Sequence, residues 1–142
     1  MNYKRYSIAV DSLYDELEKM LKNKAFDNKK IYIFGTSKIT TIMISFLKQN
    51  GIVLAGLLDN DKNRWGGKLE NIDIYPPQIL EDYQENAVIL IASSYQSEMI
   101  GQLEKMGYKM LENIIKVIDL PKLMKDYSFV DRSGKQEMND DQ

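Results

Sequence analysis

The stretch from Lys30 to Leu47 places a strand, a glycine turn and a helix in direct succession. The apolar residues Ile31 to Phe34 are β-branched or aromatic and run directly into Gly35, which indicates a buried parallel strand that reaches its carboxyl end. Hydroxyl residues follow, and then an apolar helical segment. Because such a turn points backbone N–H groups and a helix N-terminus at an anion, the stretch predicts the opening of a nucleotide-binding βαβ unit.

The glycine pattern of this turn is incomplete. A full dinucleotide fingerprint has glycine at three positions, whereas this chain keeps Gly35 and has Ser37 and Thr40 at the other two. A side chain at position 37 narrows the room for a pyrophosphate, although its hydroxyl can donate to a phosphate. Thr36, Ser37 and Thr40 suit helix capping equally well, so ligand binding and capping both stay open here.

Strands and helices alternate along the rest of the chain. Apolar runs predict further strands over 52–58, 72–75, 87–92 and 114–118, and helical patterns predict a helix ending near Gly51, one over 78–85, one closed by Gly107 and a short one over 122–127. This alternation favours a doubly wound, Rossmann-like α/β fold with a mostly parallel five-stranded sheet and right-handed crossovers. We expect three segments: an N-terminal helix and linker (1–28), the Rossmann-like domain (29–127) and a polar, disordered tail (128–142).

The extra N-terminal helix is predicted over residues 8–23. Its apolar stripe consists of Val10, Leu13, Leu17, Met20 and Leu21. Several large side chains in water are unfavourable, so the stripe must be covered. The helix precedes the first strand and the sheet faces already receive crossover helices, so we expect cover from a second copy of the chain, as a homodimer; packing on the chain's own sheet is the alternative.

Composition narrows the function. The chain has no cysteine and no histidine, which removes thiol nucleophiles, disulfides, the commonest general base and the commonest transition-metal ligand. A Tyr-x-x-x-Lys pair is absent because Met99 stands four residues after Tyr95. We therefore assign no catalytic and no metal-binding residue. No long apolar run indicates a membrane span and no secretory signal is present, which favours a cytoplasmic protein without a membrane partner. A formal net charge of −2 argues against nucleic acid.

Candidate ligand residues follow three of the predicted strands. Asp59 lies roughly 20 residues past the glycine turn, where a carboxylate accepts ribose hydroxyls and favours NAD over NADP; a solvated turn acid is the alternative. Carboxyl ends of parallel strands meet at one edge of a sheet, so one pocket is expected. Its lining would be Gly35, Thr36, Ser37, Lys38, Asp59, Ser93, Ser94 and Tyr95. Trp65 is expected mainly to anchor the loop after the second strand, with base stacking as the alternative.

An ordered set of motifs resembles a known family. The set is Phe34-Gly35, Leu58 to Lys62 with Trp65-Gly66, Ile72 to Pro77, and Ile91 to Tyr95. It is similar to the small Rossmann-like domain of bacterial surface-polysaccharide and sugar-nucleotide proteins, which resembles the N-terminal part of sugar-nucleotide dehydratases and acyltransferases. The resemblance covers roughly residues 29–119. It implies an accessory module that binds a small-molecule nucleotide, NAD or a sugar nucleotide, beside a partner enzyme. An NAD-dependent epimerase or dehydratase subunit and a ligand-free interaction domain are the alternatives.

Overall fold

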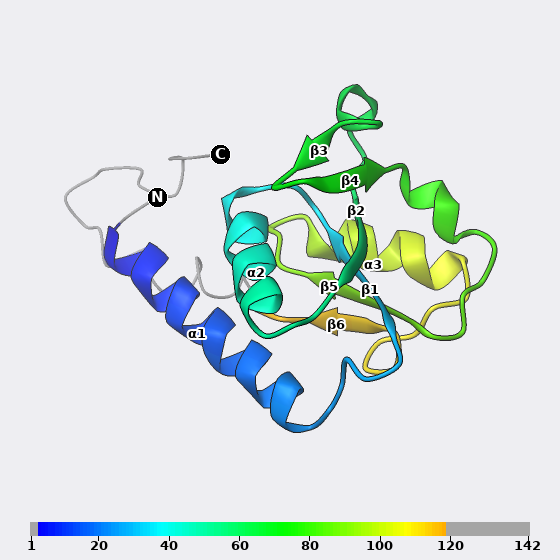
Figure 1. Cartoon of the computed structure of the whole chain (residues 1–142). Helices are drawn as coiled ribbons and strands as arrows, with labels where there is room; N and C mark the ends of the chain where they lie inside the picture. Colours follow the sequence, from blue (N-terminus) through cyan, green and yellow to red (C-terminus); the bar gives the residue numbers. More distant parts are fainter. Residues whose placement is uncertain (1–2, 119–142) are drawn as a thin grey trace.

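The structure is a computed structural model that describes the backbone of residues 3–118 and the side chains of residues 10–118 (Figure 1). Its helices are α1 (Tyr3–Lys22), α2 (Lys38–Gln49) and α3 (Gln96–Lys105), with short 3-10 turns η1 (Lys62–Arg64) and η2 (Pro77–Leu80). Its strands are β1 (Lys30–Phe34), β2 (Leu54–Leu58), β3 (Lys68–Leu69), β4 (Ile72–Tyr75), β5 (Ala87–Ile91) and β6 (Ile114–Lys116). The predicted helix over 122–127 and the tail over 128–142 lie outside the described residues.

The sheet is mixed and mostly parallel, in the order β3-β4-β2-β1-β5-β6. All five strands expected from the sequence are present and parallel to one another. The expected number of strands was wrong by one, because β3 folds back antiparallel onto β4. The mixed α/β, Rossmann-like architecture is confirmed.

The sixth strand belongs to a short hairpin at the edge of the sheet. Glu70 and Asn71 form its turn with positive φ angles of 52° and 69°, the backbone conformation that a two-residue hairpin favours. The Lys68 ammonium lies 2.6 Å from the Asp73 carboxylate across the pair, and this hydrogen bond raises the pKa of Lys68. A strand of two residues is too short to show an apolar alternation, which is why the sequence indicated only a loop.

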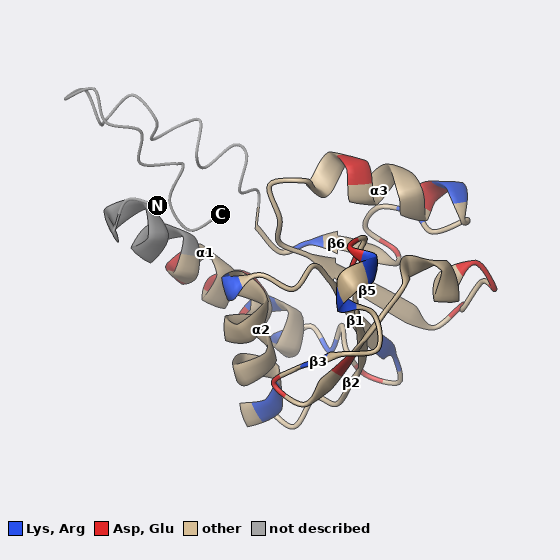
Figure 2. Cartoon of the chain, turned by 90° about the horizontal axis from the view of Figure 1, so that it is seen from above, with Lys and Arg blue, Asp and Glu red and all other residues tan. Residues whose placement is uncertain are grey.

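The two crossover helices lie on opposite faces of the sheet, because β1–α2–β2 and β5–α3–β6 run outward in opposite directions from the centre (Figure 2). Alternate strand residues serve the two faces. On β1, Ile31 and Ile33 belong to the cluster shared with α1 and α2, whereas Tyr32 and Phe34 belong to the cluster shared with α3. The helix expected over 78–85 is only the 3-10 turn Pro77–Leu80, which begins at a proline as a first helical turn allows.

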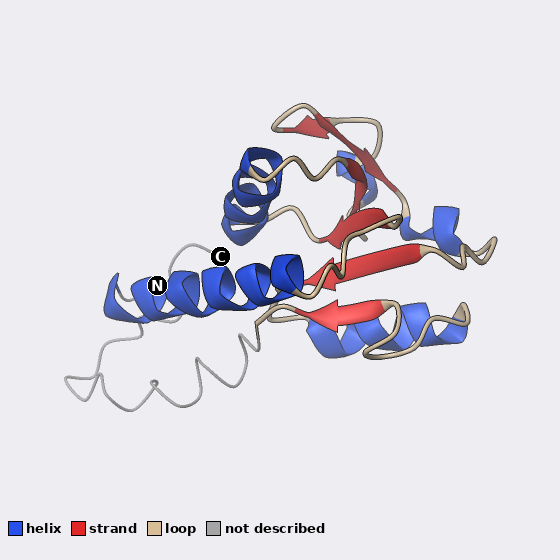
Figure 3. Ribbon diagram, turned by 60° about the horizontal axis from the view of Figure 1, so that its bottom comes forward, coloured by secondary structure: helices blue, strands red, loops and turns tan. Residues whose placement is uncertain are grey.

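Helix α1 is part of the intramolecular core, beside α2 on the same face of the sheet (Figure 3). Leu13 and Leu17 are 0% exposed, and Tyr14 contacts Phe46 of α2 with ring centroids 5.7 Å apart. The homodimer expectation assumed that crossover helices already covered this face. In fact the face is shared, because α1 belongs to the same buried cluster as α2, Val88 and Leu90 of β5, and residues 117 and 118 after β6. The argument for a homodimer through this helix therefore falls.

A buried tyrosine fixes the opposite, amino edge of the sheet. The Tyr108 hydroxyl donates to the Leu80 carbonyl at 2.9 Å and accepts the Gln84 N–H at 3.0 Å. Tyr83 stacks on the Tyr108 ring with centroids 4.8 Å apart. These contacts fix the position of the segment between η2 and β5. The 3-10 turn η2 is the only helical structure described between β4 and β5, so the contacts supply the order that a longer helix would give.

We expect Tyr108→Phe to lower the free energy of unfolding by about 1–3 kcal/mol, because a buried carbonyl loses its donor.

Burial raises the pKa of Tyr108. The folded chain therefore holds this proton more tightly than the unfolded chain, and the associated stability is present below about pH 10 and lost as the pH rises through the folded pKa. Urea unfolding at pH 7 and above pH 10 measures both effects: the difference between wild type and variant should shrink at high pH. Tyr83→Phe is the control, because its ring keeps the stack. A difference that is constant with pH would contradict the assignment.

Candidate functional site

The predicted site loops lie at one edge of the sheet. Phe34, the last residue of β1, pairs with Leu58 at the end of β2 and with Ile91 at the end of β5. Gly35, Asp59 and the segment leading to Ser93 therefore leave the sheet on the same side. Strand order reverses at β1, since α2 leads to β2 on one side while β5 lies on the other. Open α/β sheets bind ligands at this kind of switch point.

The glycine turn is closed by its own side chains. Gly35 has a φ of +112°, a conformation that strains any residue with a Cβ, and its N–H donates to the Leu58 carbonyl at 2.7 Å. The buried Thr40 hydroxyl donates to the Gly35 carbonyl at 2.9 Å and accepts the Ser37 N–H at 3.1 Å. Ser37 is the N-cap residue of α2. Thr40, at the third fingerprint position, thus has a structural role in the turn.

Asp59 faces this turn across the edge of the sheet. Its Oδ2 accepts the Thr36 hydroxyl at 2.6 Å, and its Oδ1 accepts the Asp61 N–H at 2.8 Å. Both carboxylate oxygens are therefore engaged within the chain. The Asp59 side chain is half-buried, faces the glycine turn through Oδ2 and forms the turn of its own loop through Oδ1. These contacts suit both a ribose-binding acid and a turn acid, the two alternatives that the sequence left open.

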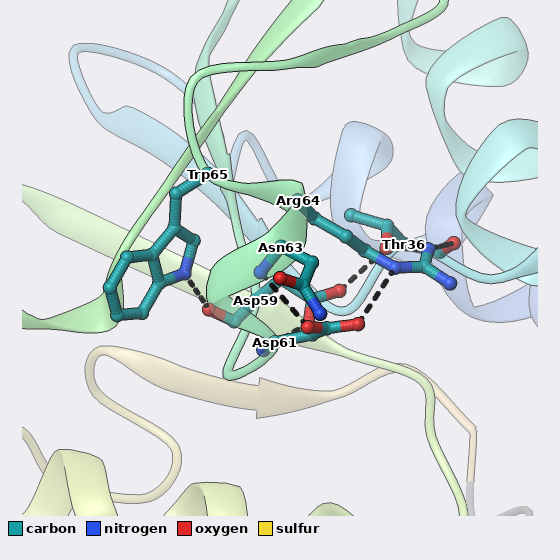
Figure 4. A network of polar contacts seen from close by, with 6 residues as sticks. All are labelled: Thr36, Asp59, Asp61, Asn63, Arg64 and Trp65. Carbon is teal, nitrogen blue, oxygen red and sulfur yellow. Dashed lines mark hydrogen bonds and ion pairs between the residues drawn. The ribbon is translucent and has the colours of Figure 1, made fainter.

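Two residues that sequence reasoning did not assign to the site complete this network, drawn in Figure 4. Arg64 Nη1 donates to the Thr36 hydroxyl at 2.6 Å and to the Thr36 carbonyl at 3.1 Å, and its Nε lies 3.6 Å from an Asp61 carboxylate oxygen. The Trp65 indole N–H donates to the Asp59 carbonyl at 2.7 Å. Trp65 therefore anchors the loop, as expected.

The same loop is tied to α3. The Asn60 and Gln102 side-chain amides exchange two hydrogen bonds, at 2.8 and 2.9 Å. Since α2 and α3 cover opposite faces, the loop after β2 joins the turn on one face to the helix on the other. A pair 42 residues apart gives no local sequence signal, which is why neither amide was singled out.

The third predicted loop, Ser93 to Tyr95, lies at the same edge of the sheet but is not part of this hydrogen-bond network. The Ser93 hydroxyl accepts the Tyr95 N–H at 3.0 Å, and Tyr95 is 67% exposed. Within residues 10–118 no hydrogen bond joins Ser93, Ser94 or Tyr95 to the glycine turn or to Asp59. Lys38 opens α2 and is exposed. The structure therefore brings Gly35, Thr36 and Asp59 together most closely.

The site carries both charge signs in a small space, with Asp59 and Asp61 beside Arg64. Among the described residues no group of three or more acidic side chains is placed to hold a metal ion. No helix within residues 3–118 combines the length and the apolar character needed to cross a membrane.

The sheet order, the glycine turn and the acid after β2 define a Rossmann-like domain. The chain belongs to the C2185-like, N-terminal family, whose model matches residues 27–115, more than half of its length. No curated protein matches the sequence. Nothing in the family or in the structures below points to surface-polysaccharide proteins, so that part of the resemblance is not supported.

Solved structures with the same fold include two of a Rex-family repressor. One is RSP, a Rex-family repressor, with a TM-score of 0.52 and 16% identity over 90% of this chain and 68% of that one. The other is RSP in complex with β-NAD⁺ and operator DNA, with a TM-score of 0.52 and 16% identity over 90% of this chain and 66% of that one. At this identity the likeness concerns the fold.

The exclusion of a nucleic-acid partner is corrected by the second structure, in which a protein with this fold is bound to operator DNA. The exclusion rested on a formal net charge of −2. Net charge sums over all surfaces of a chain, so a value near zero does not exclude a local nucleic-acid contact, and the inference was wrong for that reason.

Proposed function

We propose that this chain is a non-catalytic module that binds NAD at the carboxyl edge of its sheet. The observation that carries the proposal is that Asp59 contacts the Gly35–Thr36 turn at the point where strand order reverses. The Thr36 hydroxyl oxygen lies 2.6 Å from Asp59 Oδ2. In this arrangement Asp59 accepts the ribose hydroxyls, and the turn with the start of α2 faces the phosphates.

Three further points support the proposal. A repressor with the same fold has been solved with β-NAD⁺. The chain carries neither histidine nor cysteine, so a binding role suits its side chains better than acid–base or nucleophilic chemistry. Ser93, Ser94 and Tyr95 follow β5 at the same edge and would border the ligand on the side away from Asp59.

The single tryptophan provides a direct test, because the Trp65 indole N–H donates to the main-chain carbonyl of Asp59. We expect NAD⁺ and NADH to change Trp65 fluorescence saturably and to raise the thermal midpoint, since a ligand that binds only the folded chain stabilises it. NADP⁺, ADP and a UDP-sugar are titrated in parallel, the last because the sequence motifs resemble sugar-nucleotide proteins. Trp65→Phe, read by calorimetry, controls for loss of the optical signal.

Two outcomes would reject the proposal. One is the absence of both a saturable signal and a thermal shift with NAD⁺ and NADH at millimolar concentration. The other is a UDP-sugar that binds more tightly than either dinucleotide, which would transfer the site to sugar nucleotides.

A further inference from the structure

We infer that the Thr36 hydroxyl is an internal substitute for a ribose hydroxyl, so that the nucleotide binds by displacing it from Asp59. This inference rests on the proposed function and adds a regulatory property to the same site. The site would be self-occupied when empty, and Thr36 would weaken binding rather than support it.

The donors and acceptors around Thr36 fix where its proton lies. Arg64 can only donate, so its Nη1 contact at 2.6 Å makes the Thr36 oxygen an acceptor. The single hydroxyl proton is then left for Asp59 Oδ2, which it reaches at 2.6 Å. A hydroxyl donating to a carboxylate at this distance is a charge-assisted hydrogen bond. It is also the kind of contact that a ribose hydroxyl would make with the same oxygen.

The second carboxylate oxygen is also held. Asp59 Oδ1 accepts the Asp61 N–H at 2.8 Å, and the loop beyond is fixed by the Trp65 contact to the Asp59 carbonyl. Each carboxylate oxygen can accept more than one hydrogen bond, so competition depends on direction. The Thr36 hydroxyl takes the side of Oδ2 that faces the glycine turn, which is the side that the proposed function gives to the ribose, so a ribose hydroxyl competes with the Thr36 contact there. The apparent affinity equals the intrinsic affinity multiplied by the fraction of molecules in which that contact is open.

Arg64 strengthens the closed arrangement. Its second contact, to the Thr36 carbonyl at 3.1 Å, ties the loop after β2 to the turn after β1 through the backbone as well as the side chain. Thr36 itself is half-buried and its hydroxyl has no other hydrogen-bond partner among the described residues. Valine has nearly the shape of threonine, with a methyl group in place of the hydroxyl. Thr36→Val therefore removes the donor to Asp59 and also the side-chain acceptor of Arg64 Nη1, while the Thr36 carbonyl stays available to Arg64.

The experiment measures the affinity of the full chain for NAD⁺ and ADP by calorimetry. We expect Thr36→Val to bind both more tightly than wild type by roughly 10- to 150-fold, the range for one hydrogen bond to a charged group. Thr36→Ser keeps the hydroxyl and should stay near wild type. Thr36→Ala removes the hydroxyl in a second way and should reproduce the gain if valine perturbs the fold. Thermal unfolding of each variant checks that it is folded.

The ligand provides a matched control. 2′,3′-Dideoxy-ADP has the phosphates and base but no ribose hydroxyls, so its affinity should be the same for wild type and Thr36→Val. An unchanged or weaker affinity of Thr36→Val and Thr36→Ala for NAD⁺ and ADP would overturn the inference, as would an equal gain for the dideoxy ligand. These results leave the proposed function standing as long as wild type binds NAD⁺, whereas a wild type that binds no nucleotide rejects both.

Discussion

Leu17→Glu is expected to abolish the cooperative thermal unfolding transition of this protein. Leu17 is 0% exposed and lies in the cluster that α1 shares with α2 and the sheet. The substitution removes a fully buried apolar side chain, worth about 1.5–3 kcal/mol, and places a carboxylate among the apolar side chains of this cluster. The combined loss is comparable with the 5–15 kcal/mol that stabilises an ordinary domain. Circular dichroism during heating measures the transition.

Ser12→Glu is the matched control, because Ser12 is exposed on the same helix. We expect it to shift the free energy of unfolding by no more than about 0.5 kcal/mol. The contradicting result is a folded Leu17→Glu chain with a sharp transition, since that would mean α1 is dispensable to the core and free to pack elsewhere.

Asp59→Asn is expected to weaken NAD⁺ binding roughly 10- to 150-fold. The amide keeps one acceptor oxygen but loses the charge, and hydrogen bonds to a charged group contribute about 1.5–3 kcal/mol. The same change removes the repulsion between a carboxylate and the 2′-phosphate of NADP⁺, so the preference for NAD⁺ over NADP⁺ should fall as well. Trp65 fluorescence titrations with the two cofactors measure both effects.

Asp27→Asn serves as the control for charge alone, because Asp27 is exposed in the linker before β1. It should bind NAD⁺ as wild type does. If wild type binds NADP⁺ as tightly as NAD⁺, or if Asp59→Asn retains full affinity, the ribose does not lie at Asp59.

Local sequence patterns were enough to predict the positions of most strands and of the glycine turn. The apolar run before Gly35 located β1, the position of Gly35 located a turn that requires positive φ, and the next apolar run located Asp59 at the end of β2. Parallel strands place such ends together, so the meeting of Gly35 with Asp59 at one edge was foreseeable. The identity of a bound nucleotide was not, because turn residues and acids of this kind suit several.

What the sequence missed depends on contacts between distant residues. Arg64 reaches Thr36, 28 positions earlier, and no periodicity marks that pair. The packing of α1 was misjudged because counting crossover helices does not say how much of a sheet face each one covers. The hairpin strand β3 went unseen because two residues carry no alternation.

The cluster that contains Leu13 and Leu17 also contains Val117 and Ile118, about a hundred residues later in the chain. Contacts of such long sequence separation are slow to form, because a large loop must close before they contribute. During synthesis, the apolar stripe of α1 emerges well before the segment after β6 that shares its cluster. This face of the protein is therefore incomplete until residues 117 and 118 have been made. We expect a nascent chain that pauses between β5 and β6 to leave part of the apolar stripe of α1 uncovered and open to chaperones and to other chains.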